Sequence, residues 1–269
     1  MPELPDLEAM SWFLNQRLPG VRIERAELPI PFIVRAPKEE FVAAVEGSTF
    51  GEITRRGKFL LFTLESGKQM VVNAMLTGRF QYVAPKIKRR ARTCVVLSLA
   101  NGQELRYVDS RLMGKIYLVG PDGLDRVPQF AEMGLDALSP ELTEEAFAER
   151  LRRHNGQIKN ILLNQKFIAG IGNAYSDEIL FAAGIHPYRK RTILSDEEVS
   201  KLYRALRSVI EWAVPRIKER IKDELPLEEA RDFVRVHRRG GEACYVCGNR
   251  ISEITAGNRV TSFCRTCQR

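Results

Sequence analysis

Four cysteines near the C-terminus have the spacing that best suits a defined chemistry. They stand as Cys244-x-x-Cys247 and Cys264-x-x-Cys267, with sixteen residues between the two pairs. Two such pairs can bring four thiolates around one zinc ion in a closed tetrahedral site, which is structural because no position is left open for a substrate. Two disulfides or a chance pattern are the alternatives. Cys94 lies unpaired in an apolar run and favours a reducing cytosol.

The segment around these cysteines is basic. Residues 235–269 hold seven arginines against two glutamates, and further basic clusters lie at residues 55–58 and 86–92. The whole chain has 42 Lys and Arg against 34 Asp and Glu, a formal net charge of +8. One charged run is typical of a solvated loop, but clustered positive charge in three segments favours nucleic acid over a membrane surface. No apolar run approaches the roughly 18 residues of a membrane span.

The start of the chain, Met1-Pro2-Glu3, is a second candidate for chemistry. If Met1 is removed, as a small second residue generally permits, Pro2 presents a secondary amine. An α-amino group has a pKa of about 7.7–8.0 against about 10.4 for lysine, so near neutral pH roughly several hundred times more of it is the neutral nucleophile. Its addition to a sugar C1′ would give an iminium ion, an electron sink for later eliminations. Glu3 would protonate the opened sugar oxygen. Taken alone, Pro-Glu is only a chain end.

The pattern of apolar residues changes near residue 130. A helix is predicted over 6–18, followed by strands at 59–64, 70–76, 94–99, 105–108 and 116–119. Short strands without helices between them predict an antiparallel sandwich or barrel-like domain over 1–130. Helices are predicted at 144–153, 157–164, 173–183 and 195–222, where Pro215 should bend or end the last one. The sequence thus predicts a helical domain over 131–230 and a finger over 231–269.

Five motifs in this order carry a family resemblance. They are Met-Pro-Glu-Leu-Pro at the start, Arg-Arg-Gly-Lys-Phe-Leu at 55–60, Ala-Gly-Ile-Gly-Asn-Ala-Tyr at 169–175, Gly-Ile-His-Pro at 184–187, and the four-cysteine finger with Arg259. Together they resemble the formamidopyrimidine-DNA glycosylase/endonuclease VIII family over essentially the whole chain. The resemblance implies an α+β chain with an N-terminal β-sandwich, a helix–two-turn–helix domain and a zinc finger, which close on duplex DNA that contains a damaged base.

The resemblance also assigns roles to residues. Pro2 would be the Schiff-base nucleophile, Glu3 the acid/base, and Lys58 an ammonium at a hairpin tip beside the sugar and phosphate of the lesion. Asn173 and Arg259 would bind phosphates around the flipped nucleotide, which suits a helix N-terminus and an arginine fork. Taken alone, Asn173 could be only a helix cap and Lys58 only a solvated turn lysine.

Further residues of the resemblance would contact DNA near the lesion. Lys159 sits where the family has a lysine near the DNA. Leu76 takes the position of the wedge that fills the stack vacated by an extruded base. In Asp-Ser-Arg-Leu-Met-Gly, residues 109–114, Arg111 is kept for the widowed base, while Met113 replaces an aromatic wedge.

The chain departs from the family pattern in three places. Asp6 stands where Glu is usual, so its carboxylate is set back by one methylene. Arg and Lys replace a histidine-containing segment between Lys86 and Cys94. Residues 218–229 are charged and lack the family's Gly-Gly-Thr/Ser signature. The preferred lesion stays open among oxidised purines, oxidised pyrimidines and bulkier bases.

We expect a monomeric, cytoplasmic and nucleoid-associated enzyme with one structural zinc ion. It would excise a damaged base and cleave the abasic strand by β,δ-elimination. A second hypothesis is a catalytically silent protein that binds damaged DNA on the same scaffold. A third is an unrelated zinc-ribbon adaptor for nucleic acid. Intact Pro2, Glu3 and Lys58 favour the enzyme.

Overall fold

Eight strands near the N-terminus form two four-stranded antiparallel sheets in the computed structural model, which describes residues 1–269. In the first sheet the order is β1 (Ile23–Glu27), β6 (Thr93–Leu99), β7 (Glu104–Asp109), β5 (Gly78–Val83). In the second it is β2 (Phe50–Arg56), β3 (Phe59–Leu64), β4 (Gln69–Asn73), β8 (Lys115–Val119). These strands belong to the first of two compact units, which comprises residues 1–131 and 214–230.

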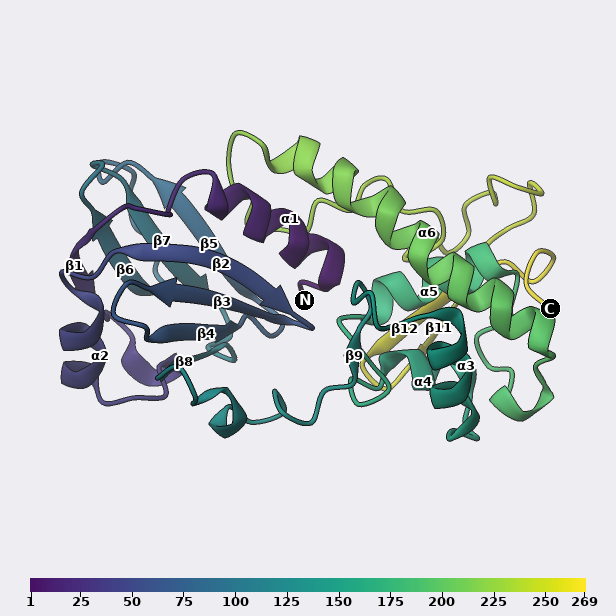
Figure 1. Cartoon of the computed structure of the whole chain (residues 1–269). Coiled ribbons are helices and arrows are strands. Elements are labelled where there is room, and N and C mark those ends of the chain that lie inside the picture. The colour runs from purple at the N-terminus through teal and green to yellow at the C-terminus, as the bar shows by residue number, and fades with distance from the viewer. The chain divides into compact units, whose positions relative to one another are not determined.

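The core of the first unit lies between its two sheets (Figure 1). Phe62 of β3 and Phe80 of β5 come from opposite sheets, and their ring centroids lie 5.2 Å apart. Buried aliphatic and aromatic side chains from both sheets surround them: Met70, Val72, Val95, Leu97, Leu105, Tyr107 and Ile116. This packing confirms the predicted antiparallel sandwich.

Helix α1 (Leu4–Asn15) is fastened to the second sheet at its C-terminal end. The Asn15 side chain accepts a hydrogen bond from the backbone N–H of Ile53 at 2.9 Å and donates one to the backbone oxygen of the same residue at 2.5 Å. The other helical segments of this unit are α2 (Lys38–Val45), 3-10 turns at Pro31–Ile33 and Leu124–Arg126, and the C-terminal end of α6 (Asp196–Ile221) from residue 214 onward.

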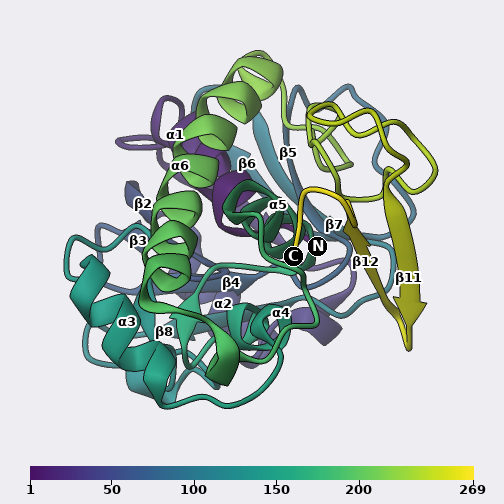
Figure 2. The same cartoon turned by 90° about the vertical axis from the view of Figure 1, so that its right-hand side faces the viewer.

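The second unit comprises residues 132–213 and 231–269. It contains α3 (Glu144–Arg152), α4 (Ile158–Leu163), α5 (Asn173–Ala183), a 3-10 turn at Arg191–Ile193 and the greater part of α6 (Asp196–Ile221). Two short strands, β9 (Leu135–Asp136) and β10 (Ile168–Ala169), pair in parallel. The hairpin of β11 (Ser252–Ala256) and β12 (Arg259–Phe263) is the yellow pair of arrows in Figure 2. The three domain ranges predicted from the sequence stay a prediction, because the compact units group the finger residues with the helices.

Several predicted elements have different bounds in the structure. The strand expected at 70–76 ends at Asn73, because the Asn73 side-chain oxygen accepts the N–H of Met75, whose φ of +49° leaves the extended region. Helix α6 runs through Pro215, so of the two predicted effects of this proline the end of the helix is excluded, and the bend stays a prediction. No helix combines the length and hydrophobicity that crossing a membrane requires.

The sheet-to-sheet core makes a stability prediction. Phe62 is fully buried, so Phe62→Ala should lower the free energy of unfolding by about 3–5 kcal/mol through lost burial and the cavity left behind. Phe32→Ala is the matched control, since that ring is 64% exposed and its loss should change stability by less than about 0.5 kcal/mol. Urea denaturation of both variants measures the difference, and equal midpoints would contradict this account of the core.

Candidate active site and nucleic-acid interface

The N-terminal residues are held by the start of helix α1. The backbone N–H of Glu3 donates to Asp6 Oδ2 at 2.8 Å, and the two residues form a reciprocal capping box. Both side chains are nearly buried, Glu3 at 2% and Asp6 at 6% exposure, and Pro2 is buried beside them. Asp6 therefore reaches the N-terminus in spite of its shorter side chain, and it orients Glu3.

Lys58 occupies the tip of the hairpin between β2 and β3. The turn is Gly57-Lys58, and Gly57 adopts a φ of +56°, which a side chain would disfavour. Arg55 donates to the Gly57 oxygen at 3.2 Å, and its Nε pairs with Glu8 of α1 at 2.8 Å. The hairpin that carries Lys58 is thus tied to the helix that carries the N-terminus.

The predicted wedge residues lie on two loops that one buried carboxylate joins. Asp109, which is fully buried, accepts hydrogen bonds from the Thr77 hydroxyl and, at 2.6 Å, from the N–H of Gly114. The N–H of Arg111 donates to Thr77 Oγ1 at 3.1 Å and to Asp109 Oδ1 at 3.2 Å. Asp109 therefore fixes residues 75–77 against residues 110–114.

The side chains on these loops are presented to solvent. Leu76 is 37% exposed, Met113 is 38% exposed, and Arg111 is exposed as well. Their neighbours Met75 and Leu112 both have positive φ, +49° and +54°, a strained conformation for residues with such side chains. The two loops are thus held in place with apolar side chains pointing outward.

The N-terminus of α5 and the β11–β12 hairpin meet in the second unit. Asn173, the first residue of α5, donates from its side-chain amide to the backbone oxygen of Val260 at 2.7 Å. Val260 adjoins Arg259, which is exposed at the start of β12. Asn173 and Arg259, predicted separately from the sequence, therefore lie on two elements in direct contact.

Lys159 is buried beside the same hairpin, with 4% exposure. Its ammonium lies 2.6 Å from Asp177 Oδ1 and donates to Thr261 Oγ1 at 2.9 Å and to the Val260 oxygen at 3.1 Å. A buried lysine is stable only when paired in this way. A direct DNA contact by Lys159 stays a prediction, and the described contacts give it a part in holding the hairpin.

Two adjacent acids of α5 anchor the segment that leads to the finger. Asp177 Oδ2 lies 2.7 Å from His237 Nδ1, and Glu178 accepts three backbone N–H groups, from residues 235, 236 and 237. Burial raises the pKa of Glu178, against the lowering effect of these donors. Sequence reasoning missed both acids. The only signal was a charged pair inside an otherwise apolar helix.

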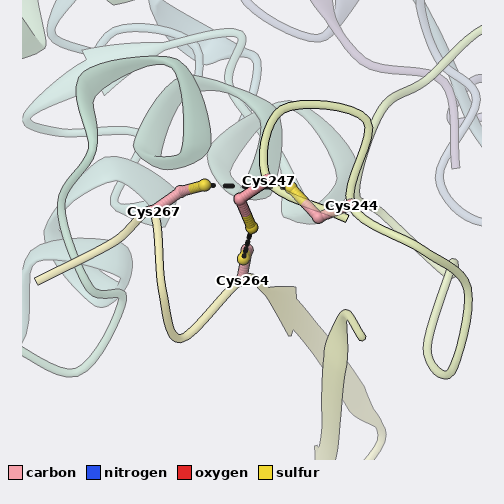
Figure 3. Close-up of side chains that lie close together, drawn as sticks. All are labelled: Cys244, Cys247, Cys264 and Cys267. Carbon is pink, nitrogen blue, oxygen red and sulfur yellow. Dashed lines mark hydrogen bonds between the residues drawn. The ribbon is translucent and has the colours of Figure 1, made fainter. Parts of the chain in front are cut away.

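The four cysteines converge as the spacing predicts (Figure 3). All their sulfur atoms lie within 4.8 Å of one another, with Cys244 and Cys267 at 3.8 Å and Cys247 and Cys264 at 3.5 Å. A regular tetrahedron with Zn–S bonds of about 2.3 Å has edges of about 3.8 Å, so the sulfurs fit one zinc ion. A hydrogen bond from the backbone of Asn249 lowers the pKa of Cys247 to about 7, whereas burial raises the pKa of Cys267 in the same cluster.

Three family models match consecutive parts of the chain. The N-terminal domain of formamidopyrimidine-DNA glycosylase matches residues 1–116, and the H2TH domain of the same enzyme matches residues 133–224. A zinc finger found in FPG and IleRS matches residues 241–269.

Whole-length relatives agree with these matches. A formamidopyrimidine-DNA glycosylase of Pelotomaculum thermopropionicum is 35% identical, with 100% of this chain and 99% of that protein covered. One of Symbiobacterium thermophilum is 39% identical over 100% of this chain and 89% of that protein. The chain belongs to the formamidopyrimidine-DNA glycosylase family. The resemblance stated from the motifs is therefore confirmed.

Solved structures of this family share the fold. The Lactococcus lactis Fpg in complex with DNA containing an abasic site has a TM-score of 0.91 and 27% identity, with 99% of each chain covered. The same enzyme with DNA containing N7-benzyl-Fapy-dG has a TM-score of 0.91 and 28% identity over all of both chains. The predicted fold class, a β-sandwich followed by a helix–two-turn–helix domain and a zinc finger, is thereby confirmed.

The cysteine geometry makes a prediction about metal. We expect one zinc ion per chain, and Cys264→Ser should release it and weaken binding to duplex DNA more than it destabilises the sandwich. Cys94→Ala is the matched control, since this buried free cysteine lies outside the cluster and its loss should leave the zinc content at one. Metal analysis and DNA titration of both variants test this. If Cys264→Ser binds duplex DNA as tightly as wild type, the folded zinc finger does not contribute to DNA binding.

Proposed function

We propose that this chain is a base-excision DNA repair enzyme that removes a damaged base from duplex DNA and then cleaves the abasic strand. The glycosylase class follows from the family to which the chain belongs. One observation above all supports the lyase step. Pro2 and Glu3 are adjacent and buried at a capped helix start, where removal of Met1 would leave the Pro2 amine next to the Glu3 residue.

The chemistry begins after removal of Met1. The lone pair of the Pro2 nitrogen attacks C1′, and the electron pair of the glycosidic bond leaves with the damaged base, which takes up a proton. Glu3 protonates the ring oxygen as the sugar opens, and the nitrogen loses its proton to give the iminium ion. Loss of a C2′ proton then expels the 3′ phosphate, and a second elimination expels the 5′ phosphate.

Three side chains hold the strand around the lesion. The ammonium of Lys58, at its hairpin tip, would approach the sugar and phosphate. Asn173 and Arg259 would bind neighbouring phosphates from two elements that touch each other. Lys159 supports this role through the carbonyl of the residue after Arg259.

Three residues would occupy the space that the extruded nucleotide leaves. Leu76 and Met113 are exposed apolar side chains on coupled loops, so they can enter the base stack without moving a core residue. Arg111, on the second loop, would face the widowed base. A structural zinc ion on the four cysteines would keep the finger folded, and the enzyme would act as a monomer on duplex DNA with an oxidised or otherwise damaged base.

The nucleophile can be tested by chemical trapping. Borohydride should reduce the iminium ion on abasic-site duplex and leave wild type, with Met1 removed, covalently joined to DNA. Retention of Met1 or Pro2→Gly should reduce trapping by roughly 100-fold, because a lysine such as Lys58 offers several hundred times less neutral amine. If processed wild type binds abasic DNA tightly but is never trapped, the chain is a damage-binding protein.

Loss of the Glu3 carboxylate should affect base excision and abasic-site cleavage differently. Glu3→Gln should slow base excision by about 10²–10⁴-fold while some cleavage of preformed abasic sites remains, because sugar opening is needed chiefly in the first step. Glu24→Gln, an exposed carboxylate on β1, should change neither activity. Single-turnover assays on both substrates measure these rates, and an equal loss on the two would contradict this role.

The phosphate contacts predict a salt dependence. Arg259→Ala should weaken binding to a duplex with a stable abasic-site analogue and make the negative slope of log K against log salt less steep by about 0.9, since one fewer counterion is released. Asn173→Ala should weaken binding with no change in slope because the amide is neutral. Arg25→Ala, which removes an equal exposed charge on β1, outside the predicted phosphate contacts, is the control. Affinity that is flat with salt would contradict the electrostatic account.

A further inference from the structure

A carboxylate outside the predicted site contacts the N-terminal amine. Glu229 Oε1 lies 2.7 Å from the nitrogen of Met1, and the same oxygen lies 2.5 Å from Arg79 Nη2. Glu229 is the last residue of the charged stretch 218–229, which lacks the family signature, and it lies in segment 222–230, which follows α6 within the first unit. The segment that departs most from the family pattern thus supplies an ion-pair partner for the N-terminal amine.

Arg79 is a rigid holder for this carboxylate. Its side chain is only 10% exposed, and its other terminal nitrogen donates to the backbone oxygen of Gly78 at 2.7 Å. Gly78 has no room for a side chain, since a Cβ there would lie 1.9 Å from the Tyr107 hydroxyl. Arg79 is therefore fixed at the start of β5, directly after the loop that carries Leu76.

Glu229 and Pro2 share one cavity. It has a volume of about 30 Å3, and its polar lining includes Asp6, Arg79 and Glu229, with apolar residues of α1, α6 and segment 222–230 around them. Such a volume holds about two water molecules. Since one residue spans no more than about 3.6 Å, the Pro2 nitrogen lies no more than about 6.3 Å from Glu229 Oε1, and a water in the shared cavity would bridge the two.

We propose that Glu229 is the base that accepts the proton of the Pro2 amine, and that Arg79 is the residue that positions it. This inference rests on the proposed nucleophilic role of Pro2. When the Pro2 nitrogen adds to C1′ it becomes positively charged, and its proton then passes to the Glu229 carboxylate, which returns the electron pair that forms the iminium ion. A general base must lie within hydrogen-bond distance or one water of the proton it removes, and Glu229 meets that condition.

Other carboxylates are less suited to this step. Asp6 accepts the backbone N–H of Glu3, and Glu3 must deliver a proton to the sugar rather than store one from the amine. A lone carboxylate would stabilise the ammonium and suppress the nucleophile. The guanidinium of Arg79 offsets that charge, so Glu229 offers an acceptor with little net field at the nitrogen.

Opposite pH shifts distinguish this role from simple support of the fold. The charged residues that line the cavity of Pro2 are Asp6 on α1, Arg79 on β5, and Glu228 and Glu229 on segment 222–230, and Glu3 adjoins Pro2 as the N-cap of α1. Arg79→Gln leaves the Glu229 carboxylate unbalanced, which raises the pKa of the amine. The acidic limb of the trapping rate should then move to higher pH by about one to three units.

Glu229→Gln should do the reverse. It leaves Arg79 unbalanced, which lowers the pKa of the amine and moves the acidic limb to lower pH, while loss of the base slows trapping on the plateau by about 100-fold. Glu229→Asp should recover part of the rate. In the double variant both charges are gone, so the limb should return near its wild-type position while the plateau stays low.

The measurement is single-turnover borohydride trapping on abasic-site duplex from pH 5 to pH 9, with thermal melting of each variant as a check on folding. Glu224→Gln is the control because this carboxylate is exposed on the same segment and lies outside the cavity lining. Wild-type trapping that depends on Pro2, with unshifted profiles in the Arg79 and Glu229 variants, would overturn this inference and leave the proposed function standing. Absence of trapping by wild type would overturn both.

Discussion

The reciprocal hydrogen bonding of Glu3 and Asp6 is the constraint on which the chemistry of the first unit depends. Each carboxylate is nearly buried, and a buried carboxylate is tolerated only when hydrogen bonds replace its water. The first turn of a helix provides free N–H groups and a positive dipole end for this purpose. Because α1 begins directly after Glu3, the capping of this helix sets the position of Pro2, the proposed nucleophile.

Local features of this architecture could be predicted from the sequence, whereas contacts between distant residues could not. Strand β3 has the predicted bounds because an apolar run lies between two glycine turns, and the cysteine cluster follows from spacing alone. Strand β1, Ile-Glu-Arg-Ala-Glu, was missed because its charged residues interrupt the alternation of apolar and polar residues, although Ile23 and Ala26 are buried. The pair of Arg79 and Glu229 spans 150 positions, and no local pattern signals it.

Because Lys159 is buried, the DNA contact inferred for it from the family resemblance would be indirect. Sequence places Lys159 near DNA, but it cannot show that the ammonium faces Asp177 inside the protein. With the hydroxyl of Thr261 and the oxygen of Val260 as its other partners, this lysine joins α4, α5 and β12. Loss of its charge would leave the Asp177 carboxylate buried and short of a partner, which is costly. Its effect on DNA would therefore pass through the hairpin of Arg259.

Hydrogen bonds to Asp109 hold the two strained loops whose apolar side chains, Leu76 and Met113, face solvent. A left-handed residue other than glycine costs about 1–3 kcal/mol, and Met75 and Leu112 both adopt that conformation. Three hydrogen bonds to the fully buried Asp109 carboxylate offset the strain. Without them, the free-energy cost of burying this carboxylate would exceed the backbone strain of either loop. The loops are thus ordered before DNA arrives. Because the loops need no further ordering, Leu76 and Met113, in their proposed role as wedges, would replace lost stacking at a smaller entropic cost.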